Sequence, residues 1–238
     1  MKKVTLVLLC MTIVTLASCY GQSLSGKMIY KIQLVGFGED NKDPEFKELN
    51  ESIIEIANKQ TATLTFNSTQ SSCVLGKQLV SDSGNNSLRI MAEKIAFIEI
   101  NEANYFLDKS INSVVLQNMD GILIEKKHEK LDWEITTESK MIDSYLCYKA
   151  IYLMKFVNRR GMNTSMPIVA WFAPSLPYPY GPKYFNGLPG LILELSDRKT
   201  TFLASSIIIS KDKEVKIDFP KGKTISQDDY TKKVMSIK

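Results

Sequence analysis

The sequence predicts a mainly β protein of the α+β type, built on a strongly curved antiparallel sheet or half-barrel with one or two helices from its N-terminal half packed on it. Short runs of alternating apolar residues follow one another closely from about residue 104 onward. Turn dipeptides separate most of these runs, and strands at such spacing favour a sandwich, a barrel or one curved sheet. Helical periodicity is confined to the first half, which is typical of helices that cover one face of a sheet.

The N-terminal half predicts two helices between strands. Asp43 followed by Pro44 is an N-cap with proline at the first helical position, and apolar residues at helical spacing extend the helix over 44–58. The segment 88–100 fits either a helix or a helix that passes into a strand, and the helix is favoured. Alternation and β-branched residues predict strands at 26–35, 61–66 and 71–80.

The C-terminal half predicts a meander. Asp120-Gly121, Arg160-Gly161 and Ser196-Asp197 are turn signals between its runs. The charged tail after the last run is interpreted as a solvated terminus. Strands are predicted near 104–109, 112–119, 122–128, 131–138, 145–157, 166–173, 190–196 and 201–210.

Composition places the chain among ordinary globular proteins. Of its 238 residues, 44% are hydrophobic and 24% charged. No linker-like stretch divides residues 22–238, so one domain is expected. Without Lys2 and Lys3, 28 basic side chains face 26 acidic ones. No basic stripe with interleaved aromatics is present, so no nucleic-acid partner is predicted.

The first residues have the pattern of a secretory leader. Met1-Lys2-Lys3 is basic, and Val4 to Ala17 is apolar but too short for a membrane span. Cleavage near Gly21 and Gln22 would remove a signal peptide of residues 1–21. Alternatively, Leu16-Ala17-Ser18-Cys19 resembles a lipobox, and removal of 1–18 would leave Cys19 acylated. The protein is therefore expected to be exported, to the periplasm, the outer membrane or the medium, with membrane contact only through an anchor at Cys19.

Two cysteines remain after the leader, Cys73 and Cys147. In an oxidising compartment they could form a disulfide worth about 4 kcal/mol. They could equally be two separate buried thiols that behave as small apolar residues. The sequence leaves both readings open.

Residues 171–193 are unusually rich in backbone-restricting residues. Five of the chain's eight prolines and three of its twelve glycines lie there. Proline fixes φ and removes a donor, whereas glycine permits positive φ. Such a segment loses less entropy on ordering than an ordinary loop, so a rigid crossover is predicted.

This segment resembles the GLPGLI family, because its naming hexapeptide is present as Gly187, Leu188, Pro189, Gly190, Leu191 and Ile192. Trp133-Glu134-Ile135-Thr136, Tyr145, Cys147, Ala170-Trp171-Phe172 and Gly181-Pro182 are similar to other recurrent positions of that family. The resemblance implies an exported or envelope protein of the Bacteroidetes lineage. It implies no activity, because none is assigned to the family.

Motifs that would indicate catalysis are lacking. The single histidine, His128, excludes sites that need two histidine ligands, and no metal or cofactor is predicted. His128 could pair with Cys147, but its neighbours Glu125 to Lys130 indicate a solvated, charged hairpin end. Carboxylates could still converge in space for acid–base work, although a polar outer face explains them equally simply. These acids are Glu134, Glu138, Asp143 and Glu194.

Six aromatic residues in and beside the crossover are candidates for a ligand or partner face. They could line an apolar cleft, or they could cap the core beneath the proline-rich segment. The first hypothesis for function is a non-catalytic binding or carrier module for an apolar or amphiphilic ligand. The alternatives are an accessory protein that docks to an outer-membrane complex and a carboxylate-dependent hydrolase. The six residues are Trp171, Phe172, Tyr178, Tyr180, Tyr184 and Phe185.

Overall fold

The computed structural model describes residues 25–36, 42–76, 87–100, 103–158, 160–210 and 214–236. The expected leader and both alternatives for Cys19 therefore lie outside the described residues. Within those described ranges, no helix has both the length and the apolar character needed to cross a membrane.

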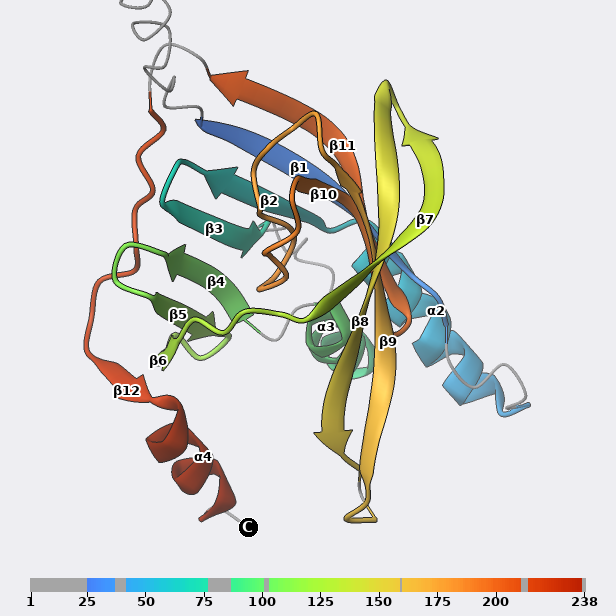
Figure 1. Cartoon of the computed structure of the whole chain (residues 1–238). Helices are drawn as coiled ribbons and strands as arrows, with labels where there is room; N and C mark the ends of the chain where they lie inside the picture. Colours follow the sequence, from blue (N-terminus) through green and yellow to red (C-terminus); the bar gives the residue numbers. More distant parts are fainter. Residues whose placement is uncertain are drawn as a thin grey trace, which may run out of the picture.

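The described chain is mainly β and forms one open sheet of twelve strands (Figure 1). The strand order is β12-β6-β5-β4-β3-β2-β1-β11-β10-β9-β8-β7, and every pair is antiparallel except β12 with β6. The strands are β1 (Ser25–Leu34), β2 (Thr61–Phe66), β3 (Gln70–Leu75), β4 (Ala103–Asp108), β5 (Ser113–Asn118), β6 (Leu123–Lys127), β7 (Trp133–Ile142), β8 (Tyr145–Val157), β9 (Asn163–Ala173), β10 (Leu191–Asp197), β11 (Thr200–Ser210) and β12 (Thr224–Ser226).

Strand β1 joins the two halves of the sheet, because it pairs with β2 on one side and with β11 on the other. Its alternating residues Met28, Tyr30, Ile32 and Leu34 are all buried, as the period-two pattern predicts. The core of the molecule therefore begins on the strand nearest the N-terminus of the described chain.

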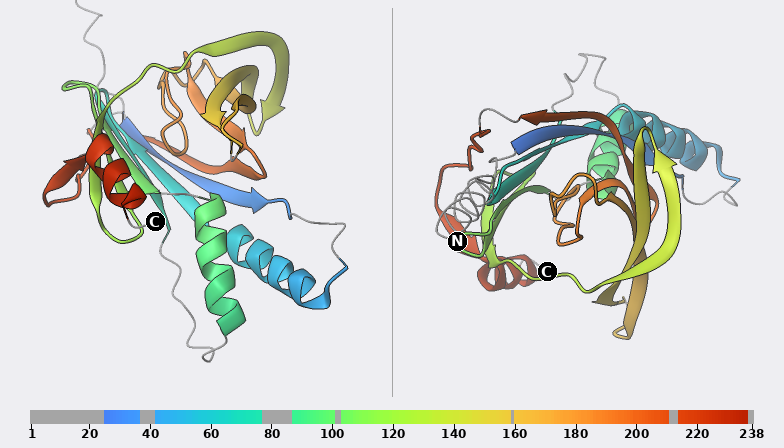
Figure 2. Two further views of the ribbon diagram at one scale, coloured as in Figure 1. Left: turned by 90° about the horizontal axis from the view of Figure 1, so that it is seen from below. Right: turned by 45° about the horizontal axis from the view of Figure 1, so that its top comes forward.

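The sheet bends around the segment that connects β9 to β10, which lies inside the arch in Figure 2. A second sign of bending is the ion pair between Lys140 on β7 and Glu194 on β10, whose Nζ and Oε2 atoms are 2.8 Å apart. Two strands lie between β7 and β10, and a flat sheet would hold them about 14 Å apart. A short ion pair over that span requires the sheet to curl locally.

Helices α2 (Pro44–Asn58) and α3 (Ser87–Ile100) pack against each other and against β1 at one end of the sheet (Figure 2). The predicted start of α2 is confirmed, since the Asp43 side chain accepts a 3.0 Å hydrogen bond from the Glu45 amide and Pro44 opens the helix. The favoured helical interpretation of 88–100 is also confirmed. Small residues such as Ala57 and Ala96 are fully buried, which lets the two helices approach closely.

The C-terminal tail is solvated, as predicted, since no residue of its helix is buried, but it has secondary structure that the sequence did not predict. Strand β12 pairs in parallel with β6, and helix α4 (Gln227–Met235) follows it. Ser226 caps that helix through a 3.1 Å bond from the Asp229 amide. A three-residue strand is too short to leave a periodic signal, which is why the sequence did not predict it.

The two cysteines are separate free thiols, so the alternative of a Cys73–Cys147 disulfide is wrong for this structure. Cys73 lies on β3, where its sulfur accepts a 3.2 Å bond from the Lys183 amide, and Cys147 lies on β8. Burial raises the pKa of each thiol to about 11. Both side chains fill core space as small apolar residues.

The folded protein should therefore resist alkylation by iodoacetamide at neutral pH, because the thiolate is the reactive species and burial disfavours it. After denaturation without a reductant, mass spectrometry should show both Cys73 and Cys147 modified. If these two thiols stay unmodified until a reductant is added, they form a disulfide and the separation seen here is contradicted.

Candidate functional site

The connection between β9 and β10 is a proline-rich crossover, residues 174–190, that is closed by its own backbone. The Leu191 amide donates to the Leu176 carbonyl at 2.9 Å, and the Ile192 amide donates to the Tyr180 carbonyl at 3.0 Å. The Gly187 amide donates to the Pro179 carbonyl at 3.0 Å. The segment therefore folds back on the strand that follows it and is not an open loop, as the sequence predicted.

Side chains of the crossover fill much of the concave side of the sheet. Tyr178 and Tyr180 pack on Phe66 of β2, with ring centroids 4.7 and 5.9 Å apart respectively. From β1, the Tyr30 hydroxyl donates a buried 2.6 Å bond to the Ile192 carbonyl. These contacts tie the crossover to strands from the N-terminal half.

Two glycines in the hexapeptide serve different backbone needs. A Cβ atom at Gly190 would lie 2.3 Å from the Ala173 carbonyl oxygen, so only glycine allows the crossover to approach the end of β9. Gly187 has a φ of +92° with no atom near the position of a Cβ. Packing therefore requires glycine at position 190, and the positive φ favours glycine at position 187.

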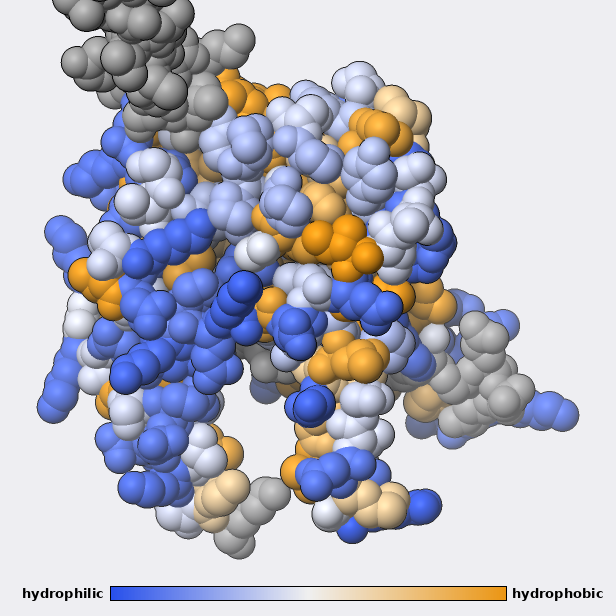
Figure 3. Space-filling model, viewed as in Figure 1, coloured by the Kyte–Doolittle hydropathy of each residue, from blue (hydrophilic) through white to orange (hydrophobic). Residues whose placement is uncertain are grey.

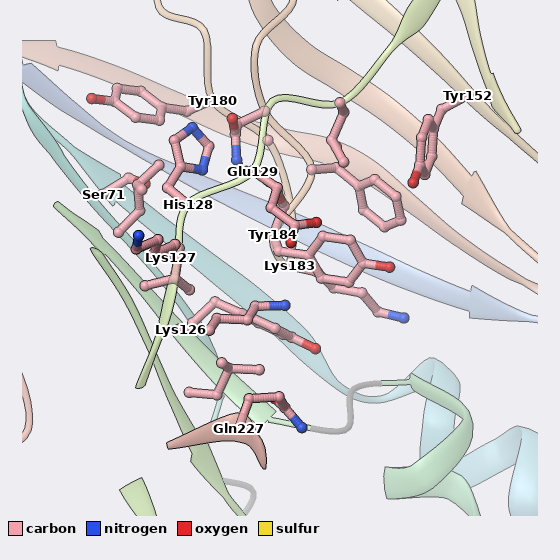
Figure 4. A pocket seen from close by; sticks show the side chains of 18 residues that line it. Ser71, Lys126, Lys127, His128, Glu129, Tyr152, Tyr180, Lys183, Tyr184 and Gln227 are labelled. Carbon is pink, nitrogen blue, oxygen red and sulfur yellow. Dashed lines mark hydrogen bonds between the residues drawn. The ribbon is translucent and has the colours of Figure 1, made fainter. Parts of the chain in front are cut away.

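A cleft of about 300 Å³ remains between the crossover and the β3–β6 part of the sheet. Figure 4 shows Lys126 and Gln227 on one side of this cleft and Tyr152 on the other. Its lining combines strands β3, β4, β5, β6 and β8, the segment after β6, the crossover and the start of α4. The lining residues are Ser71, Tyr105, Leu107, Val114, Leu116, Lys126, Lys127, His128, Glu129, Leu131, Tyr152, Tyr180, Gly181, Lys183, Tyr184, Phe185, Asn186 and Gln227.

One wall of the cleft is aromatic. Tyr184 stacks on Phe185 with ring centroids 4.4 Å apart, and Tyr105 of β4 lies 5.5 Å from Tyr184. Trp133, at the start of β7, donates its indole N–H to the Asn186 carbonyl at 2.9 Å. The wall is thus contacted from both halves of the sheet, by β4 and by β7.

The opposite side of the cleft is basic. The Lys126 ammonium lies 5.5 Å from the centroid of the Tyr184 ring, within the range of a cation–π contact. Nearby, the Lys109 ammonium lies 4.2 Å from the centroid of Tyr180, and burial lowers the pKa of Lys109. Lys126 therefore contacts the aromatic wall within the cleft, and Lys109 contacts Tyr180 beside it.

His128 lines this cleft, which corrects its interpretation as part of a solvated hairpin end. Burial lowers the pKa of its imidazole, and the positive charge of Lys109 lowers it further, against a smaller opposing effect of Glu129. The ring is therefore neutral at pH 7. No sequence motif marks His128 as part of a site, because the residues around it come from strands that are distant in sequence.

Lys183 also borders the cleft, but its ammonium is engaged elsewhere. It donates a 2.6 Å bond to Oδ2 of Asp197, and both side chains are almost fully buried. Oδ1 of Asp197 accepts no hydrogen bond from the described residues, although the Arg198 guanidinium lies 4.0 Å away. This pair anchors the crossover to the end of β10, since breaking a buried ion pair leaves an uncompensated charge.

The six predicted aromatic residues do not form one surface. Tyr180, Tyr184 and Phe185 line the cleft, whereas Phe172 and Tyr178 are buried in the core away from it. Trp171 lies elsewhere on β9, beneath the Lys140 ammonium at 4.3 Å. Because four of the six are buried, the set cannot serve as the exposed docking face that the second hypothesis required.

The candidate carboxylates lie outside the cleft. Glu194 is bonded through both oxygens to Lys140 at 2.8 Å, and Glu138 is bonded to Lys149 at 2.8 Å. Glu134 and Asp143 are exposed on β7 and in the turn after it. Among the described residues, Glu129 is the one carboxylate that lines the cleft, and no cluster of three or more potential metal ligands occurs.

Fold and site together define a class: a mainly β protein whose open sheet bends around an internal crossover and leaves a mixed aromatic and basic cleft. Residues 158–194 match a family model described as a protein of unknown function (Porph_ging). The match spans the β8–β9 turn, β9, the crossover and the start of β10. It does not carry the name GLPGLI, so membership of that family stays a prediction. No curated protein matches the chain.

A solved structure titled "Structure of PNGF-II in C2 space group" is similar to this chain, with a TM-score of 0.52 and 15% sequence identity. The similarity covers 91% of this chain but 33% of that one, so this chain spans about a third of the other's length. At this identity the likeness shows the fold alone.

Replacing Gly190 by alanine should destabilise the protein by about 2–4 kcal/mol, because the new methyl group would overlap the Ala173 carbonyl. Gly187→Ala is the matched control and should cost about 1 kcal/mol, since it meets only conformational strain. Urea unfolding measures both. Equal losses for the two variants would contradict the close approach at Gly190.

The chain's single histidine makes its titration easy to follow by NMR. The His128 ring should titrate below its usual pKa of about 6.5, and Lys109→Gln should raise that pKa by removing a nearby positive charge. Because the folded-state pKa is depressed, this histidine favours folding above its unfolded pKa and loses that contribution as the pH falls through the folded value. Lys31→Gln, on an exposed face of β1, should leave the titration unchanged. A pKa insensitive to Lys109 would show that the two groups do not interact.

Proposed function

We propose that this protein is an exported, non-catalytic binding module whose cleft takes a small anionic amphiphile. The observation that carries the proposal is the juxtaposition of Lys126 with the ring of Tyr184 in one cleft, where the buried Phe185 ring stacks behind Tyr184. An aromatic wall favours a flat or apolar group, and an ammonium group favours an anion next to it.

The size of the cleft restricts the ligand. About 300 Å³ lies at the lower limit of ordinary ligand pockets. The crossover fills much of the remaining concave side, which leaves little space for a long acyl chain. In this proposal the half-barrel holds one ring or a short chain with its charged head, and the remainder of a larger ligand would stay outside.

Charge supports an anionic head group. Lys126 and Lys127 line the cleft against the single carboxylate of Glu129, and His128 is neutral at pH 7. The Lys183 ammonium is neutralised by Asp197 and contributes little to the field of the cleft. The net positive charge therefore lies at the β6 side of the site.

A binding role is preferred to hydrolysis because a paired-carboxylate mechanism needs two acids in reach of one bond. The described lining has Glu129 alone, and the other candidates are bonded to lysines or exposed on β7. The likeness to PNGF-II adds no activity, because it concerns fold. The leader supports export to the periplasm or the outer membrane, with tethering if Cys19 is acylated.

Anilinonaphthalene sulfonate, an aromatic dye with one negative charge, is a suitable probe. The folded protein should bind it at one saturable site, with hexanoate as a competitor. Lys126→Gln should weaken binding about fivefold, which is the worth of about 1 kcal/mol for a partly exposed charge contact. Tyr184→Leu should weaken it too, by removing the stacking surface.

Lys31→Gln removes the same charge from an exposed face of β1 and is the matched control. Fluorescence titration gives the affinity of the dye for the unmodified protein and for the Lys126, Tyr184 and Lys31 variants, and circular dichroism verifies that each is folded. Equal affinities for the Lys126 and Lys31 variants would rule out the cleft as the site.

A further inference from the structure

Strands β8 and β9 extend beyond the rest of the sheet as a two-stranded ribbon. Strand β7 pairs with residues 145–152 of β8, and β10 pairs with 169–173 of β9. Residues 153–157 and 163–167 pair only with each other in the described chain. Five residues of strand carry this ribbon about 17 Å past its neighbours, to the bottom of Figure 1.

The turn at the end of the ribbon has a defined geometry. The Asn158 amide donates to the Met162 carbonyl at 2.9 Å, and the Asn158 side chain accepts bonds from the Arg160 and Met162 amides. Gly161 has a φ of +76°. The described residues of the tip therefore form a hydrogen-bonded turn.

Apolar side chains of the ribbon are exposed on both of its faces. Leu153 and Val157 point to one face and are 53% and 63% exposed, and Phe156 points to the other and is 41% exposed. Met162, in the turn, is 52% exposed. Figure 3 shows apolar and hydrophilic side chains side by side along this projection. Soluble proteins that gather apolar side chains at an exposed tip commonly use them for contact.

The ribbon is also basic. The sequence has no aspartate or glutamate from Ser144 to Leu193, whereas five lysines and arginines lie in that range. Two of them are neutralised from outside the range, Lys149 by Glu138 and Lys183 by Asp197. Lys155 and Arg160, both on the ribbon, have no ion pair with any described residue.

We propose that this ribbon seats its tip on an anionic lipid surface. A combination of exposed aliphatic or aromatic side chains with basic ones is suited to the boundary between head groups and acyl chains. A second copy of the chain is disfavoured as the occupant, because its ribbon carries the same positive charge. Insertion is shallow, since the outer edges of both strands carry unpaired backbone groups that hydrocarbon cannot satisfy.

This contact is independent of the cleft and of any anchor at the start of the chain. The start of β1 lies at the top of Figure 1 and the ribbon tip at the bottom. An acyl chain on Cys19 would bind membranes by itself. Every protein in the test therefore carries Cys19→Ser and is purified after export.

Co-sedimentation with vesicles tests the proposal. The protein should bind vesicles of equimolar phosphatidylcholine and phosphatidylglycerol far better than vesicles of phosphatidylcholine alone. The double variant Lys155→Gln/Arg160→Gln should reduce the partition constant about twenty-five-fold, at about fivefold per charge. Phe156→Ser/Val157→Ser should reduce binding to the anionic vesicles too, by removing apolar contact.

Lys47→Gln/Lys59→Gln removes two exposed charges, one on α2 and one at its C-cap, and should leave partitioning unchanged. Equal binding to neutral and anionic vesicles, or equal loss in both charge variants, would overturn the proposal. A dimer that sedimentation velocity detects in the parent protein but not in Phe156→Ser/Val157→Ser would also overturn the proposal, because the ribbon would then be an interface between copies. Dye binding in the cleft should not change in any ribbon variant. The dye and vesicle measurements therefore test the cleft and the ribbon separately.

Discussion

The structure depends on the way the crossover closes against the sheet. Its prolines restrict φ, and its carbonyls accept hydrogen bonds from amides within the crossover and from the Leu191 and Ile192 amides at the start of β10. Gly190 brings this loop within contact of the Ala173 carbonyl, where any side chain would clash. A segment with few alternative conformations and many internal partners loses little entropy on folding, and it can therefore act as core.

The cleft is a consequence of that packing. The crossover fills much of the concave side. Beside β3–β6 it leaves the cleft, where rings from the crossover meet lysines from β6. Tyr184 and Lys126 are 58 positions apart in sequence yet share one cation–π contact. Lys109, in the turn after β4, and His128, directly after β6, lie beside the same rings, so one small region combines ring faces, a net positive charge and a neutral imidazole. This chemistry suits binding, and it concentrates in the cleft between the crossover and β3–β6.

Sequence patterns predicted the elements well where local signals were strong. The period-two run of β1 and the Asp43–Pro44 start of α2 each record a local backbone preference, and each is found. Asp120-Gly121 and Arg160-Gly161 also lie between strands, whereas Ser196-Asp197 ends β10 and the turn falls at residues 198–199. β12 was missed because three residues carry no periodicity. The cleft was missed for a different reason: its lining is assembled from strands far apart in sequence, and Glu125 to Lys130 resembles any solvated hairpin end. Likewise, the sequence does not distinguish the environments of the six aromatic residues. In the bent sheet some of them lie in the core, some line the cleft, and Trp171 lies beneath Lys140.

Hydrogen–deuterium exchange of the crossover amides tests the central claim most directly. If the crossover is part of the core, the amides of Tyr180, Gly187 and Ile192 should exchange as slowly as those of β1, since opening them requires loss of core packing. If they exchange at the rate of an unstructured chain while β1 stays protected, the crossover is an ordinary loop and neither the curvature of the sheet nor the cleft can depend on it.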